Sequence, residues 1–152
     1  MHTISSYLES DHKRCDELFA QTNASVVAGQ WDRAQRSFQY FCQALERHMT
    51  MEENVMFPAF EQATGSYAGP THELRREHQH FRGILQRLDE SIQGHNATDF
   101  FDHTDTLRII MGQHNLKEEG ILHPMVDRIF FGKQNEIIDA MNAICTADAS
   151  AC

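Results

Sequence analysis

Two stretches of the chain, HMTMEENVMFP at residues 48–58 and HNLKEEGILHP at residues 114–124, repeat one pattern of histidine, glutamate and proline. In each stretch a glutamate follows the histidine after four residues, and a proline follows it after ten. The same shift of 66 residues places His12 on His78. The chain therefore contains an internal repeat, and each half predicts one αα-hairpin that carries a histidine, then the His-xxx-Glu-Glu pattern, then a proline.

Apolar residues recur with helical spacing along nearly the whole chain, without an alternating strand pattern. Glycine-containing turns divide it into predicted helices at 2–28, 31–63, 71–93, 99–130 and 134–145. Because short turns favour antiparallel neighbours, we expect an all-α, antiparallel up-down four-helix bundle of two repeated αα-hairpins plus a short C-terminal helix. The bundle should span residues 1–146, followed by a flexible tail at 147–152.

Each long helix carries an apolar stripe that we expect to face the interior of the bundle. The residues of these stripes are Leu8, Cys15, Phe19, Phe38, Phe41, Leu45, Met49, Leu74, Phe81, Leu85, Leu107, Ile110, Met111 and Ile121. Pro58 and Pro124 lie inside helical patterns, where the missing N–H and the ring clash should kink or end the helix.

The four histidines of the repeat are predicted to lie at one level of the bundle. The midpoint between His12 and His48 is position 30, and the midpoint between His78 and His114 is position 96, so both fall in predicted turns. In an antiparallel hairpin, residues equally far from the turn lie at the same height, here about 27 Å from it. All four imidazoles therefore meet in one layer if the two hairpins pack with their turns at the same end.

Glu52 and Glu118 each lie four residues after one of these histidines and therefore on the same helix face. A buried cluster of imidazoles and carboxylates is costly unless it binds a cation. These ligands suit iron, manganese or zinc, and two shared carboxylates favour a dinuclear site. We therefore predict a two-metal centre, with two iron ions as the first choice, whose ligands are His12, His48, Glu52, His78, His114 and Glu118.

Other polar residues near these motifs are not expected to bind the metal directly. Glu53 and Glu119 are rotated about 140° from the ligand histidines, so we expect them to be solvated or to hydrogen-bond a ligand. Cys15 is expected to pack as a small hydrophobe rather than to act as a redox thiol. The remaining histidines lie off the ligand face or near termini and turns, so we expect most of them at the surface: His2, His72, His80, His95, His103 and His123.

The composition excludes several classes of function. The chain has a net charge of −9, from 13 Lys and Arg against 22 Asp and Glu, so no basic patch is available for nucleic acid. No stretch reaches the roughly 18 apolar residues of a membrane span, and no signal-peptide pattern opens the chain, so we expect a cytoplasmic protein without a membrane partner. Its four cysteines contain no CxxC pair and do not form a disulfide framework.

With these motifs, the sequence from His12 to Pro124 resembles the hemerythrin-like, or HHE cation-binding, family. The resemblance implies a four-helix bundle with an oxo- or hydroxo-bridged di-iron centre. Oxygen-carrying hemerythrins have a further histidine where this chain has Leu74, and a His-xxxx-Asp pattern where this chain has His114 and Glu118. The chain is therefore more similar to the six-ligand branch, which includes proteins implicated in the repair of iron centres and in the nitric oxide response.

The sequence leaves three hypotheses for function. The first is a protein that binds or senses O2 or NO at the di-iron centre, with open coordination positions for the small ligand. The second is an iron-handling or redox enzyme that reduces NO or peroxide, or donates iron to damaged iron–sulfur clusters. The third is a structural bundle with zinc or manganese. A ferritin-like site ranks lower, because the Glu-xx-His strings ending at His12 and His80 are out of step with the repeat.

Overall fold

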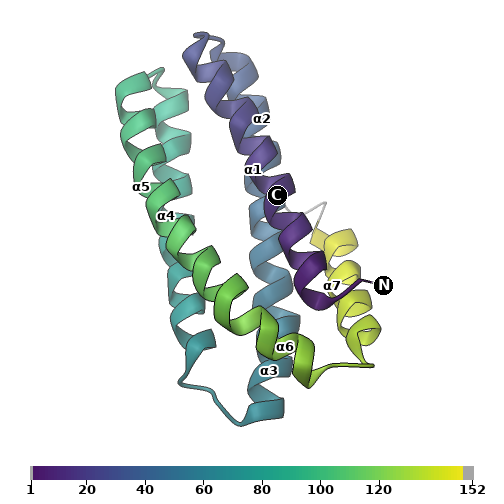
Figure 1. The fold of residues 1–152 in the computed structure, drawn as a ribbon. Coiled ribbons are helices and arrows are strands. Elements are labelled where there is room, and N and C mark those ends of the chain that lie inside the picture. The colour runs from purple at the N-terminus through teal and green to yellow at the C-terminus, as the bar shows by residue number, and fades with distance from the viewer. Residues whose placement is uncertain (1, 149–152) are drawn as a thin grey trace.

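The computed structural model describes residues 2–148, and this part of the chain is helical apart from short turns (Figure 1). Helices α1 (Ile4–Val27) and α2 (Trp31–Met51) form the first hairpin, and helices α4 (Pro70–Gln93) and α5 (Ala97–Lys117) form the second. Helix α1 packs along α2, α4 packs along α5, and α2 joins the hairpins by packing on α4. The prediction of an all-helical bundle is confirmed.

The turns of the two hairpins have the same geometry, which extends the repeat to the backbone. The N–H of Gln30 donates to the carbonyl of Ser25 at 2.9 Å, and the N–H of Asn96 donates to that of Ser91 at 2.8 Å. Gly29 and His95 take the left-handed conformation at equivalent positions, with φ of 69° and 50°. The ring of His95 also stacks on Trp31, with centroids 5.0 Å apart, so the two turns lie at the same end of the bundle.

Two π-helical turns interrupt the long helices where Pro58 and Pro124 are found. The turn Glu52–Met56 leads into α3 (Phe57–Thr64), and the turn Glu118–Leu122 leads into α6 (His123–Ile129). At the end of each turn, a peptide N–H donates to the carbonyl of the glutamate five residues earlier. Proline cannot donate to the helix and crowds the preceding turn, so one extra residue is accommodated there. The predicted kinks therefore take the form of π turns.

The extra residue in the second π turn also corrects one prediction about the core. Ile121 is predicted to face inward but is 58% exposed. Ile121 lies within the π turn Glu118–Leu122, where each residue turns less than in an α-helix, so the face that it occupies differs from the count at 100° per residue. Ile110 and Met111 are half-buried, and the other predicted core residues are buried.

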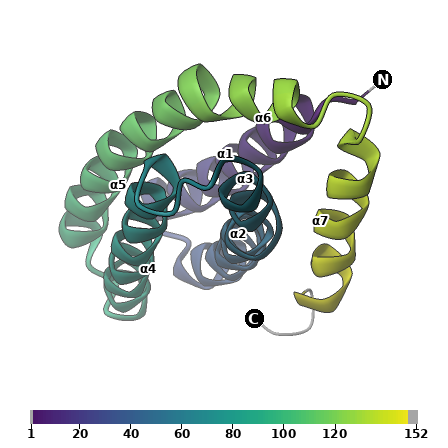
Figure 2. The ribbon, with the colours of Figure 1, turned by 90° about the horizontal axis from the view of Figure 1, so that it is seen from below.

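Two apolar clusters fill the interior, one on each side of a polar layer. The cluster nearer the hairpin turns includes Phe38, Phe41 and Phe100, and the other includes Leu8, Met51 and Leu74. Helix α7 (Gln134–Asp148) packs beside α1 and α2 and adds to the second cluster (Figure 2). Of the tail expected at 147–152, residues 149–152 lie outside the described residues.

Candidate metal centre

The structure brings the six predicted ligand residues together in the polar layer between the two apolar clusters. His12, His48, Glu52 and Glu118 offer ligand atoms that all lie within 4.8 Å of one another. A second group meets the same distance limit and consists of Glu52, His78, His114 and Glu118. Both groups are buried, and they share the two glutamates. Each pair of histidines therefore faces the same two carboxylates, which is the arrangement of a dinuclear carboxylate site.

The two glutamates connect the hairpins. Glu52 Oε1 lies 3.6 Å from His48 Nε2 on the first hairpin and 3.1 Å from His78 Nε2 on the second. Glu118 belongs to the second hairpin, and its Oε2 lies 3.4 Å from His12 Nε2 on the first. Neither carboxylate is exposed to solvent. Both are thus in position to bridge two cations.

Most of the atoms that face one another in this layer have no hydrogen-bond partner. Within the described residues, the atoms that form no hydrogen bond of good geometry, although they approach one another as ion pairs, include His48 Nε2, His78 Nε2 and both carboxylate oxygens of Glu52 and of Glu118. A buried polar atom without a partner costs about 1–3 kcal/mol. A bound cation satisfies converging imidazole nitrogens and carboxylate oxygens at once, so the donor set fits a metal centre.

A ring of four outer carboxylates surrounds the four histidines, and each carboxylate accepts a hydrogen bond from the Nδ1–H of one of them. The pairs are Asp11 with His48 at 2.8 Å, Glu53 with His78 at 2.6 Å, Glu77 with His114 at 2.9 Å, and Glu119 with His12 at 3.3 Å. In every pair the two residues come from different helical segments. Such bonds turn Nε2 toward the metal and raise the basicity of the ring.

Two of these outer carboxylates are assigned no role by the sequence reasoning. The hydrogen-bond alternative for Glu53 and Glu119 is confirmed, but Asp11 and Glu77 are missed. Each of the missed residues directly precedes a ligand histidine, at equivalent positions of the repeat. That acidic-His pair, present in both halves, is the signal that could have identified them.

Basic side chains hold three of the outer carboxylates from the outside. The ion pairs are Arg14 with Asp11 at 2.9 Å, Arg82 with Glu53 at 3.0 Å, and Lys117 with Glu77. Burial opposes ionisation of Asp11, Glu53 and Glu77, yet their histidine and basic partners lower the pKa of all three carboxyls. The outer ring is therefore negatively charged at neutral pH and complements bound cations.

The carboxylates also raise the basicity of the ligand histidines. Burial lowers the pKa of His78, but the neighbouring carboxylates of Glu52 and Glu53, which favour the protonated ring, outweigh it and raise this pKa to about 9. The pKa of His114 is raised against burial by Glu118, whose Oε1 lies 2.6 Å from its Nε2. In the metal-free protein at neutral pH, His78 therefore holds a proton that a metal ion must displace.

His123 is predicted to lie off the ligand face, and this prediction is wrong. Its side chain is fully buried, with Nε2 3.5 Å from Glu118 Oε2. Its ring also stacks on His12, with centroids 6.2 Å apart. The cause is the π turn, because a turn closed by a bond between residues i and i+5 brings His123 back over Glu118. Of the other histidines, His72 and His80 are exposed as expected.

A small cavity adjoins the cluster on the side of the hairpin turns. Its volume is ≈ 10 Å³, the space for about one water molecule. Burial raises the pKa of the Cys15 thiol in its wall to about 11, so this thiol is neutral and packs with the core. The lining residues are His12, Cys15, Asp16, Leu45, His48, Met49, His78, Phe81, Met111, His114 and Asn115.

A wider cleft of ≈ 320 Å³ lies between α1 and α5, next to the small cavity. The cleft and the cavity share Asp16, Met111 and Asn115 in their walls. Asp16 is exposed, whereas Met111 and Asn115 are half-buried. These three residues therefore connect the surface of the protein with the cavity at the cluster.

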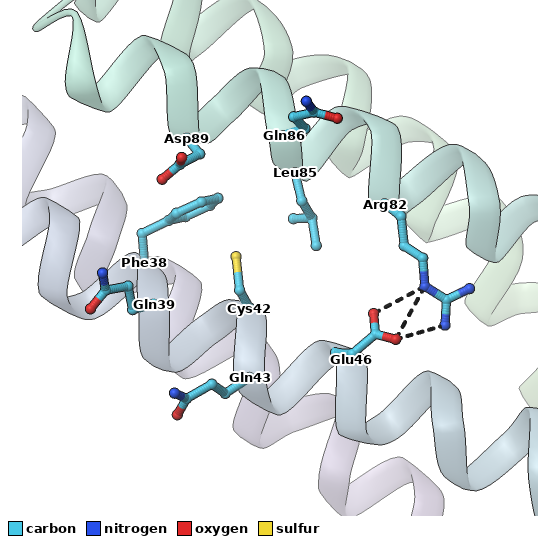
Figure 3. A pocket seen from close by; sticks show the side chains of 9 residues that line it. All are labelled: Phe38, Gln39, Cys42, Gln43, Glu46, Arg82, Leu85, Gln86 and Asp89. Carbon is cyan, nitrogen blue, oxygen red and sulfur yellow. Dashed lines mark hydrogen bonds and ion pairs between the residues drawn. The ribbon is translucent and has the colours of Figure 1, made fainter. Parts of the chain in front are cut away.

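A larger groove of ≈ 530 Å³ lies between α2 and α4, and Figure 3 shows its lining residues. The Sγ of Cys42 points between Phe38 and Leu85, and the ion pair of Glu46 with Arg82 closes one end. None of the six ligand residues lines this groove. We therefore assign the chemistry to the buried cluster and not to the larger opening.

The helical bundle and the buried His/Glu cluster define a metal-binding protein. The family model described as the hemerythrin HHE cation binding domain matches residues 3–126. The chain therefore belongs to the hemerythrin HHE cation-binding family. No curated protein and no solved structure gives a significant match. Among the described residues, none of the helices combines the length and the apolar character needed to cross a membrane.

Proposed function

We propose that this protein is a non-haem di-iron protein that binds or senses O2 or NO at a carboxylate-bridged centre. His12 and His48 would hold one iron and His78 and His114 the other, with Glu52 and Glu118 available to both. The observation that supports this proposal is the presence of two buried four-residue groups that share both glutamates. Iron, when bound, supplies the open coordination positions and the redox chemistry that diatomic ligands require.

The carboxylates around the cluster support the binding of cations. Glu52 and Glu118 supply two buried negative charges shared by both groups, and the outer carboxylates, three of which also pair with basic side chains, surround them. The outer hydrogen bonds also keep each imidazole oriented, with Nδ1–H donating outward and Nε2 facing the centre. Manganese and zinc suit the same donors, so metal analysis decides between them and iron.

The adjoining cavity supports a small ligand rather than an extended one. Its volume is ≈ 10 Å³, the space for about one water molecule beside the ligand histidines. The walls contributed by Leu45, Met49, Phe81 and Met111 are apolar, which favours O2 or NO over a charged or extended substrate. The cleft between α1 and α5 supplies the access route, through Asp16, Met111 and Asn115.

This proposal places the chain in the six-ligand branch of its family and in an antiparallel up-down bundle. Leu74, at the position of the additional histidine of oxygen carriers, is 1% exposed and packs in an apolar cluster. The same feature favours the alternative function, an iron-handling or redox enzyme that reduces NO or peroxide or donates iron to damaged clusters. The net charge of −9 argues against a nucleic-acid partner. We also propose a cytoplasmic location without a membrane partner.

Metal analysis of natively purified protein, followed by stopped-flow mixing of the reduced protein with O2 or NO, tests the proposal. We expect two iron ions per chain and a reversible adduct with its own optical spectrum. Oxidised iron without an adduct would exclude reversible O2 binding. Turnover of NO or peroxide, or iron transfer to an apo-cluster acceptor, would favour the alternative. Zinc or manganese in place of iron would refute both functions.

A further inference from the structure

The internal repeat is broken at one position next to the metal centre. Phe57 in the first half corresponds to His123 in the second. Each follows a π turn, and the peptide N–H of each donates to the carbonyl of the ligand glutamate five residues earlier. Both rings pack on a ligand histidine of the opposite hairpin, Phe57 on His78 with centroids 5.7 Å apart and His123 on His12 at 6.2 Å. The two halves thus place chemically different rings in equivalent surroundings.

His123 brings two nitrogen atoms to a place where its counterpart has only hydrocarbon. Its Nε2 lies 3.5 Å from Glu118 Oε2, and the Nε2 of His12 lies 3.4 Å from the same oxygen. The side chain is 0% exposed, and within the described residues neither ring nitrogen has a hydrogen-bond partner. An imidazole buried in this state is costly unless something satisfies it. Phenylalanine in the same place carries no such cost.

We propose that His123 is a seventh ligand of the metal centre and that it coordinates the metal ion bound by His12 and His48. This inference rests on the metal centre proposed above. His123 is not a member of either four-residue group whose ligand atoms lie within 4.8 Å of one another. Its Nε2 and that of His12 approach the same oxygen of Glu118, so we expect a cation bound there to draw the His123 side chain into contact. The Nδ1 of His123 lies 3.9 Å from Glu9 Oε1, which is beyond hydrogen-bond distance, whereas the Nδ1 of each of the other four histidines is hydrogen-bonded to a carboxylate.

The additional ligand makes the two metal positions unequal. The position of His12 and His48 has three histidines, whereas the position of His78 and His114 has two and is bordered by Phe57 instead. The two positions share the bridging glutamates, so His123 is the side chain that distinguishes their ligand sets. We therefore expect two metal ions to bind with different affinities, and loss of His123 to weaken the binding of one of them.

Cobalt(II) binding to the full chain tests this inference. The proteins compared are the wild type, His123→Phe, His123→Gln and the control His80→Gln, which removes an exposed histidine. His123→Phe places the side chain of the equivalent position 57 in the same surroundings and should therefore pack. Optical titration of the metal-free protein gives the two stepwise binding constants. Proton NMR of the cobalt-loaded protein counts the paramagnetically shifted, exchangeable imidazole N–H signals of metal-bound histidines.

We expect two unequal binding constants and five shifted N–H signals in the wild type and in His80→Gln. Both His123 variants should lose one signal, and one binding constant should fall at least about tenfold. Four signals in the wild type, or unchanged constants in the His123 variants, would refute the assignment of His123 while leaving the two-metal centre intact. A wild type that binds fewer than two cobalt ions would overturn the centre itself. The number of shifted N–H signals in the wild type tests the assignment of His123 even if a variant fails to fold.

Discussion

The hydrogen bond from His48 to Asp11 provides a quantitative test of the outer carboxylate ring. Asp11 Oδ2 accepts from His48 Nδ1 at 2.8 Å, and Arg14 binds its other oxygen at 2.9 Å. Burial opposes ionisation of Asp11, but the hydrogen bond from His48 and the charge of Arg14 lower its pKa overall. Asp11 is therefore a carboxylate at neutral pH, and it directs the lone pair of His48 Nε2 toward the metal.

Two substitutions separate the charge of Asp11 from its hydrogen bond. Asp11→Asn keeps an oxygen acceptor but removes the charge, whereas Asp11→Ala removes both. A hydrogen bond to a charged group contributes about 1.5–3 kcal/mol. Loss of such an outer partner lowers metal affinity about 10- to 100-fold, which corresponds to about 1.4–2.7 kcal/mol. We expect Asp11→Ala to weaken one of two metals by this factor and Asp11→Asn to weaken it less.

Competition with a chromophoric chelator at fixed pH measures both metal dissociation constants. Glu17→Gln, which removes an exposed charge from the same helix, is the matched control. Glu77→Ala is the equivalent change in the second half and should weaken the metal bound by His114. If wild type and Asp11→Ala bind both metals equally well, the outer carboxylates do not support the ligand histidines and the reasoning is refuted.

Three further predictions concern pH, ligand identity and access. The metal-free protein should lose stability as pH rises from about 6.5 through about 9. The reason is that His78 in the folded protein has a pKa of about 9, whereas histidine in the unfolded chain loses its proton near pH 6.5. Thermal unfolding across this pH range measures the effect. His48→Ala and Glu118→Ala should each lose at least one metal ion, whereas His80→Ala should keep both, as measured by metal analysis. Met111→Trp should slow association of O2 or NO in stopped-flow mixing without changing the metal content, because Met111 lines both the cleft and the cavity.

Each of these predictions has an outcome that contradicts it. A melting temperature of the metal-free protein that does not fall across this pH window would show that Glu52 and Glu53 do not hold a proton on His78. Equal metal content in the His48, Glu118 and His80 variants would refute the ligand assignment. An unchanged association rate in Met111→Trp would place the access route elsewhere.

The sequence alone predicts the helices and the six residues that meet in the polar layer. Helical periodicity is a local property, and so is the relation between His48 and Glu52, which are one turn apart on the same face. The level of the histidines follows from counting residues to each turn. The observed helices accordingly begin and end within a few residues of the predicted ones. The sequence also contains an acidic residue directly before His12 and before His78, but the spacing alone does not indicate their role.

The tertiary structure alone decides which side chains support the ligand histidines and which enter the layer unexpectedly. Each outer carboxylate crosses to a histidine on another helical segment, so its partner depends on how the helices pack and not on sequence spacing. The π turn after Glu118 has the larger effect, because one extra residue rotates everything that follows it relative to an α-helical count. The π turn leaves Ile121, which lies within it, exposed, and it buries His123, which follows it, against Glu118. The repeat thus determines a symmetric set of six residues, and the packed helices add the seventh residue that makes the two sides of the centre differ.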